Sequence, residues 1–182
     1  MIIFETERLY TREMDHSDYQ RLADILQDPE VMHAYEHAFN DEEVLSWLHN
    51  QLDRYKQDGH GLWALILKET SDMIGQCGLT YQHFQGESVL EIGYLLRQDC
   101  WHQGYAIEAA QAAKRYAFLQ LGCKEVYSII RDSNIASMNV AIKNGMKVRG
   151  RDIRHYYGVD MPHFGFSIRK DEFLGEKNSA TP

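Results

Sequence analysis

The residues best placed for chemistry lie around position 104, where a strand pattern gives way to a helix pattern. Residues 91–96 read Glu-Ile-Gly-Tyr-Leu-Leu, and residues 101–109 read Trp-His-Gln-Gly-Tyr-Ala-Ile-Glu-Ala. A helix that begins at Gly104 leaves its first backbone N–H groups unpaired and carries partial positive charge there, which favours a phosphate group. Glycine also lets the backbone approach a ligand closely. The preceding strand offers its backbone to an extended ligand arm, and a diphosphate joined to such an arm describes coenzyme A.

The composition limits the class of partner. A chain of 182 residues is long enough for one domain with a substantial core. The net charge of −8 argues against a primary nucleic-acid binder, because such proteins usually carry a basic patch. An acidic chain suits a cationic partner such as an amine. The histidines and cysteines show no metal-ligand spacing, so we expect no metal site.

Cysteine usage and the N-terminus indicate the compartment. Cys77, Cys100 and Cys123 are few, odd in number and widely spaced, which is typical of a reducing environment. The first residues lack the basic start and long apolar run of a signal peptide. No apolar run is long enough to span a bilayer. We therefore expect a cytoplasmic protein.

Apolar periodicity and turn residues divide the chain into helix and strand segments. Helical spacing begins near Asp15, runs from Asn40 (where Glu43 completes a capping box) to Gly59, and recurs over residues 104–121 and 134–143. Strand patterns occupy residues 8–13, 61–68, 72–81, 88–96, 124–131, 146–154 and 161–169. With no linker or repeat between them, these segments predict one α/β domain over residues 1–170. A polar, frayed tail is expected over residues 171–182.

Five segments then occur in a characteristic order. They are Thr-Glu-Arg-Leu at 6–9 with the Asp-Pro-Glu-Val-Met of 28–32, the glycine-containing strand at 74–79, Glu-Ile-Gly-Tyr at 91–94, the turn and helix at 101–109, and Asn-x-x-Ser at 134–137 leading to Lys-Asn-Gly-Met at 143–146. In these segments the sequence resembles the GNAT superfamily of N-acetyltransferases, specifically the branch of ribosomal-protein N-terminal acetyltransferases. The resemblance spans roughly residues 6–170.

The resemblance implies both a fold and a co-substrate. The fold is α/β (α+β): a single mixed, mainly antiparallel twisted sheet of six to seven strands flanked by about four helices. Acetyl-CoA is expected in a V-shaped opening between two splayed central strands. The pyrophosphate would rest on the turn and the pantetheine arm on the strand, while the later helix approaches the sulfur. The residues implied are Leu95, Leu96, His102, Gln103, Gly104, Tyr105, Ala106, Asn134 and Ser137.

Two positions depart from the family pattern. His102 stands where the turn often has glycine, and a non-glycine residue disfavours a positive φ angle. Ala141 stands seven residues after Asn134, where many members place a tyrosine general acid. Another group, or solvent, must therefore protonate the leaving thiolate.

Amide formation needs a base for the amine, a proton for the sulfur and donors for the oxyanion, and the chain offers candidates for each. Glu91 on the splayed strand is the candidate base, although it could equally be a solvated or ion-paired carboxylate. Ser137 could donate to the thiolate, or it could contact only the cofactor or backbone. Tyr156, beside His155, could be a substrate-side polar group or could pack at a strand end. Backbone N–H groups near Leu95 could stabilise the oxyanion.

The acetyl group can reach the amine through an acetyl-enzyme or by direct attack in a ternary complex. Cys77 or Cys100 could form an acetyl-enzyme, but a nucleophilic thiol needs a depressed pKa and neither cysteine has an activating neighbour in the sequence. Direct attack of the amine in a ternary complex is therefore preferred.

The sequence thus predicts an acetyl-CoA-dependent N-acetyltransferase that acts as a monomer or homodimer. Its preferred acceptor is a protein N-terminus of the ribosomal-protein type, and the alternative is a small cationic amine such as a polyamine or aminoglycoside. A rival of another class is a non-catalytic acetyl-CoA-binding module, which the absence of a tyrosine at Ala141 favours. A dehydrogenase-like nucleotide binder is a third alternative, against which the missing Gly-x-Gly-x-x-Gly fingerprint argues.

Overall fold

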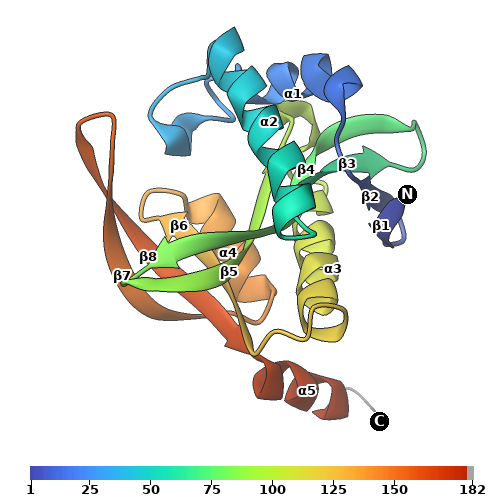
Figure 1. Ribbon diagram of the computed structural model, residues 1–182. Coiled ribbons are helices and arrows are strands. Elements are labelled where there is room, and N and C mark those ends of the chain that lie inside the picture. Colours follow the sequence, from blue (N-terminus) through green and yellow to red (C-terminus); the bar gives the residue numbers. More distant parts are fainter. Residues whose placement is uncertain (180–182) are drawn as a thin grey trace.

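A computed structural model describes residues 1–179, with side chains up to residue 175, and one eight-stranded sheet runs through it (Figure 1). The strand order across the sheet is β1-β2-β3-β4-β5-β6-β8-β7. The strands are β1 (Ile2–Glu5), β2 (Leu9–Arg12), β3 (Leu62–Leu67), β4 (Asp72–Phe84), β5 (Glu87–Leu96), β6 (Glu125–Arg131), β7 (Lys147–Tyr156) and β8 (Val159–Arg169). The mixed, mainly antiparallel sheet of the predicted fold is confirmed.

Five α-helices accompany the sheet. They are α1 (Tyr19–Leu26), α2 (Asp41–Gln57), α3 (Tyr105–Leu119), α4 (Ile135–Lys143) and α5 (Lys170–Ser179), with short 3₁₀ turns at His16–Asp18, His33–Tyr35 and Gln98–Cys100. The capping box predicted for α2 is present: Glu43 N donates to Asn40 Oδ1 at 3.0 Å, and Asn40 N donates to Glu43 Oε2 at 2.9 Å. Across the described residues, none of these helices is long and apolar enough to cross a membrane.

The junction between β5 and β6 is the one parallel pairing in the sheet, and it is very short. The two strands pair only where Glu91 meets Tyr127. By contrast, β4 and β5 stay paired along the whole of β5, from Phe84 opposite Glu87 to Gly75 opposite Leu96. β5 and β6 therefore diverge beyond Glu91, and this opens the sheet at its centre.

Helices cover both faces of the sheet and bury two apolar clusters. One cluster joins α3 and α5 to the sheet and contains Ile92 and Leu96 of β5. The other lies under α1 and α2, and Leu95 packs against it. Since side chains alternate along a strand, Glu91 and Gly93 share the α1–α2 face with Leu95, whereas Tyr94 points toward the α3 face.

The two ends of the chain differ from what the sequence predicted. β1 is an additional edge strand, so the sheet has eight strands rather than six to seven. Residues 170–179 form α5, where a frayed tail was expected from residue 171. The reason is Phe173, which is 4% exposed and stacks on Phe118 with ring centroids 4.9 Å apart. A single buried ring anchors an otherwise polar segment, and residues 180–182 lie outside the described part.

Close packing of β3 against β4 depends on Gly78, and this generates a test. A methyl group at Gly78 would lie 1.9 Å from the carbonyl oxygen of Gly61, which is backbone and cannot move aside. We expect Gly78→Ala to lower the free energy of unfolding by about 3 kcal/mol, as measured by urea denaturation. Gly175→Ala is the control, because a methyl group there has no heavy atom within 4 Å. Equal stability of the two variants would contradict this account of the packing.

Candidate active site

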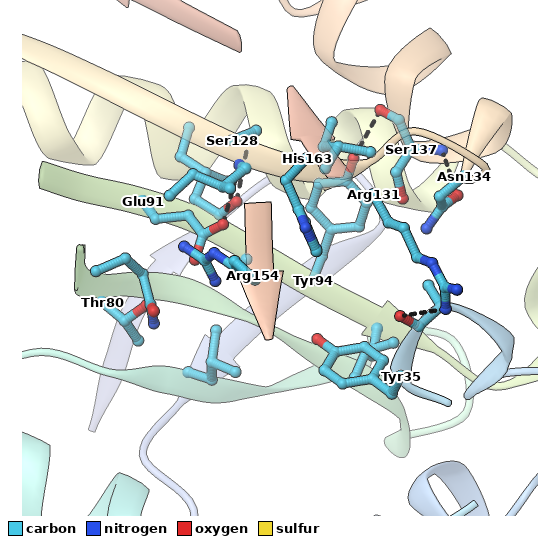
Figure 2. Close-up of a pocket in the computed structure, with 18 of the residues that line it drawn as sticks. Tyr35, Thr80, Glu91, Tyr94, Ser128, Arg131, Asn134, Ser137, Arg154 and His163 are labelled. Atoms are coloured by element: carbon cyan, nitrogen blue, oxygen red, sulfur yellow. Dashed lines mark hydrogen bonds between the residues drawn. The ribbon is translucent and has the colours of Figure 1, made fainter. Parts of the chain in front are cut away.

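A cavity of about 390 Å³ lies where β5 and β6 diverge (Figure 2). Its wall combines α2, the loop before α2, strands β4, β5 and β6, the start of α4 and the tip of the β7–β8 hairpin. The three predicted catalytic residues, Glu91, Ser137 and Tyr156, all line it. These residues come from three separate elements, and the parting of the strands brings them to one cavity.

Glu91 occupies the point where β5 and β6 last touch. Its Oε1 accepts a hydrogen bond of 3.0 Å from the backbone N–H of Ile129 on β6. Burial raises the pKa of Glu91 to about 7, against the opposing effects of nearby Arg154 and of that hydrogen bond. The carboxyl group therefore exchanges its proton near neutral pH, which is the range in which a general base is most useful.

The start of α4 forms the opposite side of the cavity. Asn134 caps the helix, since its Oδ1 accepts a 3.1 Å hydrogen bond from Ser137 N. The hydroxyl of Tyr94 donates to the carbonyl oxygen of Ser137 at 3.2 Å. Tyr94 was not predicted as a site side chain. It lies three residues after Glu91 on β5, so the two side chains point to opposite faces of the strand. Ala141 is buried, with 2% of its surface exposed.

His163 on β8 is a second lining residue that the sequence did not single out. Its side chain points into the cavity in Figure 2, and the residue is 8% exposed. Its Nδ1 lies 2.8 Å from the carbonyl oxygen of Met161, so Nδ1 carries the proton and Nε2 keeps its lone pair. Burial lowers the pKa of His163, which favours this neutral form. His163 pairs with Arg131 of β6, and this pairing brings it to the cavity. No local sequence pattern reveals such a pairing between distant strands.

Aromatic residues close the mouth of the cavity. The ring of His37, in the loop before α2, meets the ring of Tyr157 at the hairpin tip, with centroids 4.5 Å apart. Tyr35 lies edge-on to both Phe39 and Trp47. Tyr156 sits at the rim, 44% exposed, and its hydroxyl accepts a 3.3 Å hydrogen bond from Arg154 Nη1. The loop and the hairpin thus lie against each other over the opening.

The turn before α3 has the geometry of an anion site. Gly104 adopts φ +83°, and His102 also adopts a left-handed φ of +61° despite being a non-glycine residue. The first helical hydrogen bond runs from Glu108 N to Gly104 O at 3.2 Å. The N–H groups of Tyr105, Ala106 and Ile107 precede it and have no partner within the helix. Residues 102–104 are exposed, so a phosphate can reach this turn.

The start of the chain braces that turn. Arg8 Nη1 donates to the carbonyl oxygen of Gln103 at 2.9 Å, and Arg8 Nε donates to Glu108 Oε2 at 2.7 Å. The hydroxyl of Thr6 donates to Glu108 Oε1 at 2.6 Å. Burial works against the charge on Glu108, but these hydrogen bonds outweigh it and hold the pKa below its usual value. The guanidinium of Arg8 also lies 4.5 Å from the ring centre of Tyr105.

Along the free edge of β5, the backbone N–H and C=O groups of every second residue point into the gap. Ser128 Oγ on β6 donates to the carbonyl of Ile92, whereas Arg97 N donates to Ile74 on β4. Alternation therefore points the backbone groups of Tyr94 and Leu96 toward the gap and those of Leu95 toward β4. The carbonyl of Leu96 is already occupied by Trp101 Nε1 at 2.9 Å. Leu95 and Leu96 were the two strand residues expected to contact the coenzyme. The backbone N–H of Leu96 faces the gap, and Leu95 lines the cavity.

These features fit an extended ligand with a diphosphate at one end and an acyl thioester at the other. The exposed turn offers donors to a pyrophosphate, and the edge of β5 offers N–H groups to an amide-containing arm. Glu91, Ser137 and the other lining groups surround the place where that arm would end. Within residues 1–175, no cluster of three metal-binding side chains is present.

Comparisons with known proteins agree with this geometry. The family described as acetyltransferase (GNAT) domain matches residues 8–147. The chain is 34% identical over 142 residues to YkkB of Bacillus subtilis (strain 168), covering 78% of this chain and 83% of that protein. A GNAT-family acetyltransferase from Bacillus anthracis has a TM-score of 0.78 at 24% identity, covering 94% of this chain and 99% of that one. RimL, a ribosomal L7/L12 alpha-N-protein acetyltransferase in complex with coenzyme A, gives 0.76 at 17% identity, with 94% and 99% covered.

The partly buried carboxyl group of Glu91 generates a prediction for stability. A folded-state pKa of about 7 against an ordinary 4.5 means that ionising Glu91 opposes folding. The glutamine of Glu91→Gln is neutral and can still accept a hydrogen bond from Ile129 N. We therefore expect the free energy of unfolding of this variant to equal that of the parent below pH 4.5. The variant should become the more stable of the two between pH 4.5 and about 7, and the difference should then stay constant. Thermal unfolding across this range measures it. Glu87→Gln, exposed on the same strand, is the control, and an advantage independent of pH would contradict the assignment.

Proposed function

The chain belongs to the acetyltransferase (GNAT) family and is an acyltransferase, and on this premise we propose that it acetylates a primary amine, in first place a protein N-terminus of the ribosomal-protein kind. Acetyl-CoA, as co-substrate, supplies the activated acetyl group. The observation that carries the proposal is a partly buried carboxyl group, Glu91, in the cavity where β5 and β6 diverge, in the same fold as an exposed helix start at Gly104.

Each group of the cavity has a role in this proposal. Glu91 faces the α1–α2 side and accepts the proton of the attacking amine, directly or through a water molecule. On the α4 side, Ser137 supplies the proton for the departing sulfur, and the hydroxyl of Tyr94 holds this residue by donating to its carbonyl oxygen at 3.2 Å. The gap-facing N–H groups of Tyr94 and Leu96 would stabilise the negative charge that develops on the acyl oxygen. Tyr156 at the rim orients the acceptor.

The coenzyme is assigned to the turn and to the edge of β5. The N–H groups at Gln103, Gly104, Tyr105 and Ala106 would hold the pyrophosphate, with His102 shaping the turn through its left-handed φ. Asn134 fixes the start of α4, from which Ser137 reaches the sulfur end. Cys77 is deeply buried and burial raises its pKa to about 12, which supports direct attack by the amine over an acetyl-enzyme.

Two alternatives remain as competing proposals. A small cationic amine could replace the protein N-terminus as acceptor, and a non-catalytic acetyl-CoA-binding module would bind the coenzyme without using it. Release of free thiol from acetyl-CoA in the presence of an amine separates the enzyme from the module. Free cysteines among the described residues support the expected cytoplasmic location, where the enzyme would act as a monomer or homodimer.

The role of Glu91 predicts a specific pH profile. We expect kcat/KM to rise with pH through an apparent pKa near 7, because the ionised carboxylate is the active base. In Glu91→Gln that limb should disappear and kcat should fall about 100-fold or more. The measurement is thiol release from acetyl-CoA with N-terminal peptides as acceptors, from pH 5.5 to pH 9. If the variant keeps both its rate and the limb, Glu91 is not the base.

The turn predicts where the coenzyme is held. Gln103 is exposed and its side chain donates to the carbonyl of Asp99 at 3.1 Å, so Gln103→Glu should fold normally while placing a negative charge beside the pyrophosphate. We expect acetyl-CoA affinity, measured by calorimetry, to fall about tenfold at low salt and to recover partly at high salt. Gln120→Glu makes the same change at the other end of α3 and should leave the affinity unchanged. Equal losses in both variants would place the coenzyme elsewhere.

A further inference from the structure

Positive charge gathers in the cavity although the chain as a whole is acidic. The net charge of the chain is −8. Within the cavity wall, however, Arg54, Arg131 and Arg154 stand against a single carboxyl group, that of Glu91. The local charge is therefore opposite in sign to the global charge, and the overall acidity says little about the acceptor.

Two of these arginines keep their charge available. Arg131 is neutralised by Glu36, whose Oε1 lies 2.8 Å from Nη2. Arg54 instead donates to the neutral Gln51 Oε1 at 3.2 Å. Arg154 donates to the carbonyl oxygen of His83 at 3.1 Å and to the Tyr156 hydroxyl. Among the described residues neither Arg54 nor Arg154 forms an ion pair with a carboxylate, so each retains unused N–H donors.

Both guanidinium groups lie close enough to Glu91 to act on it. Arg154 and, more weakly, Arg54 favour its charged form. They approach from different elements, Arg54 from α2 and Arg154 from β7, and Figure 2 shows Arg154 beside Glu91. A ligand whose amine meets Glu91 in this cavity therefore lies near two guanidinium groups.

We propose that this site selects primary amines that also carry a carboxylate, which Arg54 and Arg154 bind while Glu91 faces the amine. The inference rests on the proposed function and names its acceptor class. In the reaction the amine nitrogen forms a bond to the acetyl carbon, the carbon–sulfur bond breaks, and the amine proton passes to Glu91. The thiolate takes a proton from Ser137, which regains one from solvent as Glu91 releases its own to solvent. The carboxylate of the acceptor is chemically unchanged and serves only for recognition by Arg54 and Arg154.

The chemistry of arginine favours this class over a polycation. The guanidinium fork matches a carboxylate with two parallel hydrogen bonds, and such charge-assisted pairs are stronger than neutral ones. A polyamine entering the cavity would meet the guanidinium groups of Arg54 and Arg154 and a single carboxyl group, that of Glu91. A carboxylate-bearing amine can come from a free amino acid or from a protein N-terminus with an acidic residue near the start, and both present the same groups.

The test compares acceptors that differ in one charge. Two C-terminally amidated peptides, Ser-Glu-Ala-Ala and Ser-Gln-Ala-Ala, are assayed by thiol release from acetyl-CoA at pH 8.5, together with glycine, glycinamide and spermidine. This pH lies above the pKa of about 7 of Glu91 in the parent. We expect kcat/KM for the Glu peptide to exceed that for the Gln peptide by about tenfold or more. A preference for glycine over glycinamide, with neither peptide used, would identify a free amino acid as the source.

Matched variants locate the discrimination. In Arg154→Gln and in Arg54→Gln the ratio between the Glu and Gln peptides should fall toward one, mainly through KM. Arg151→Gln, exposed on the same strand as Arg154 and outside the cavity, should keep the ratio of the parent. Thermal unfolding and acetyl-CoA affinity establish that each variant is folded.

The outcomes separate this inference from the function on which it rests. The proposed recognition of a carboxylate is wrong if spermidine or the Gln peptide has a kcat/KM equal to that of the Glu peptide. It is also wrong if the ratio between the two peptides is unchanged in both arginine variants. In either case the assignment as an enzyme stands. If acetyl-CoA binds but no amine releases thiol, the proposed function itself fails, and the acceptor class fails with it.

Discussion

The site depends on a sheet that loses its pairing at one position. β5 and β6 meet at Glu91 and Tyr127 and then part, so the backbone of β5 beyond this point has no strand to satisfy it. Unpaired backbone groups away from water are costly, and a sheet tolerates them only where another partner can bind. The remaining pairings, ten positions long between β4 and β5, hold the open edge rigid. The gap therefore exposes an unpaired strand edge, as the proposed extended ligand requires.

The parting of the strands also decides the electrostatics. Glu91 is partly buried where the strands part, so desolvation disfavours its charge, and Arg54 and Arg154 line the same cavity. The carboxyl group is thus held between two influences, burial that favours the neutral form and guanidinium groups that favour the anion. The resulting pKa of about 7 belongs to this balance of surroundings and not to the residue alone.

Local sequence patterns predicted the elements well but not the distant partners. The capping box at Asn40 and the helix after Gly104 depend on neighbours within a few residues, and both are present. The gathering of Glu91, Ser137 and Tyr156 followed from a resemblance to a known family. His163 and Arg154 were missed, because only the pairing of β8 with β6 and β7 brings them to the cavity. Phe173 was missed because one buried ring in a polar segment leaves no periodic signal.

The brace between Arg8 and Glu108 ties the turn to the first residues of the chain. The backbone N–H of Arg8 meets Glu108 Oε1 at 2.9 Å across a separation of 100 residues. A contact of such sequence separation forms late, since much of the chain must be ordered before its two halves can meet. During synthesis, the segment made first therefore waits for α3 to emerge before it can take its final place. The brace on this turn can therefore form only after more than half of the polypeptide has left the ribosome.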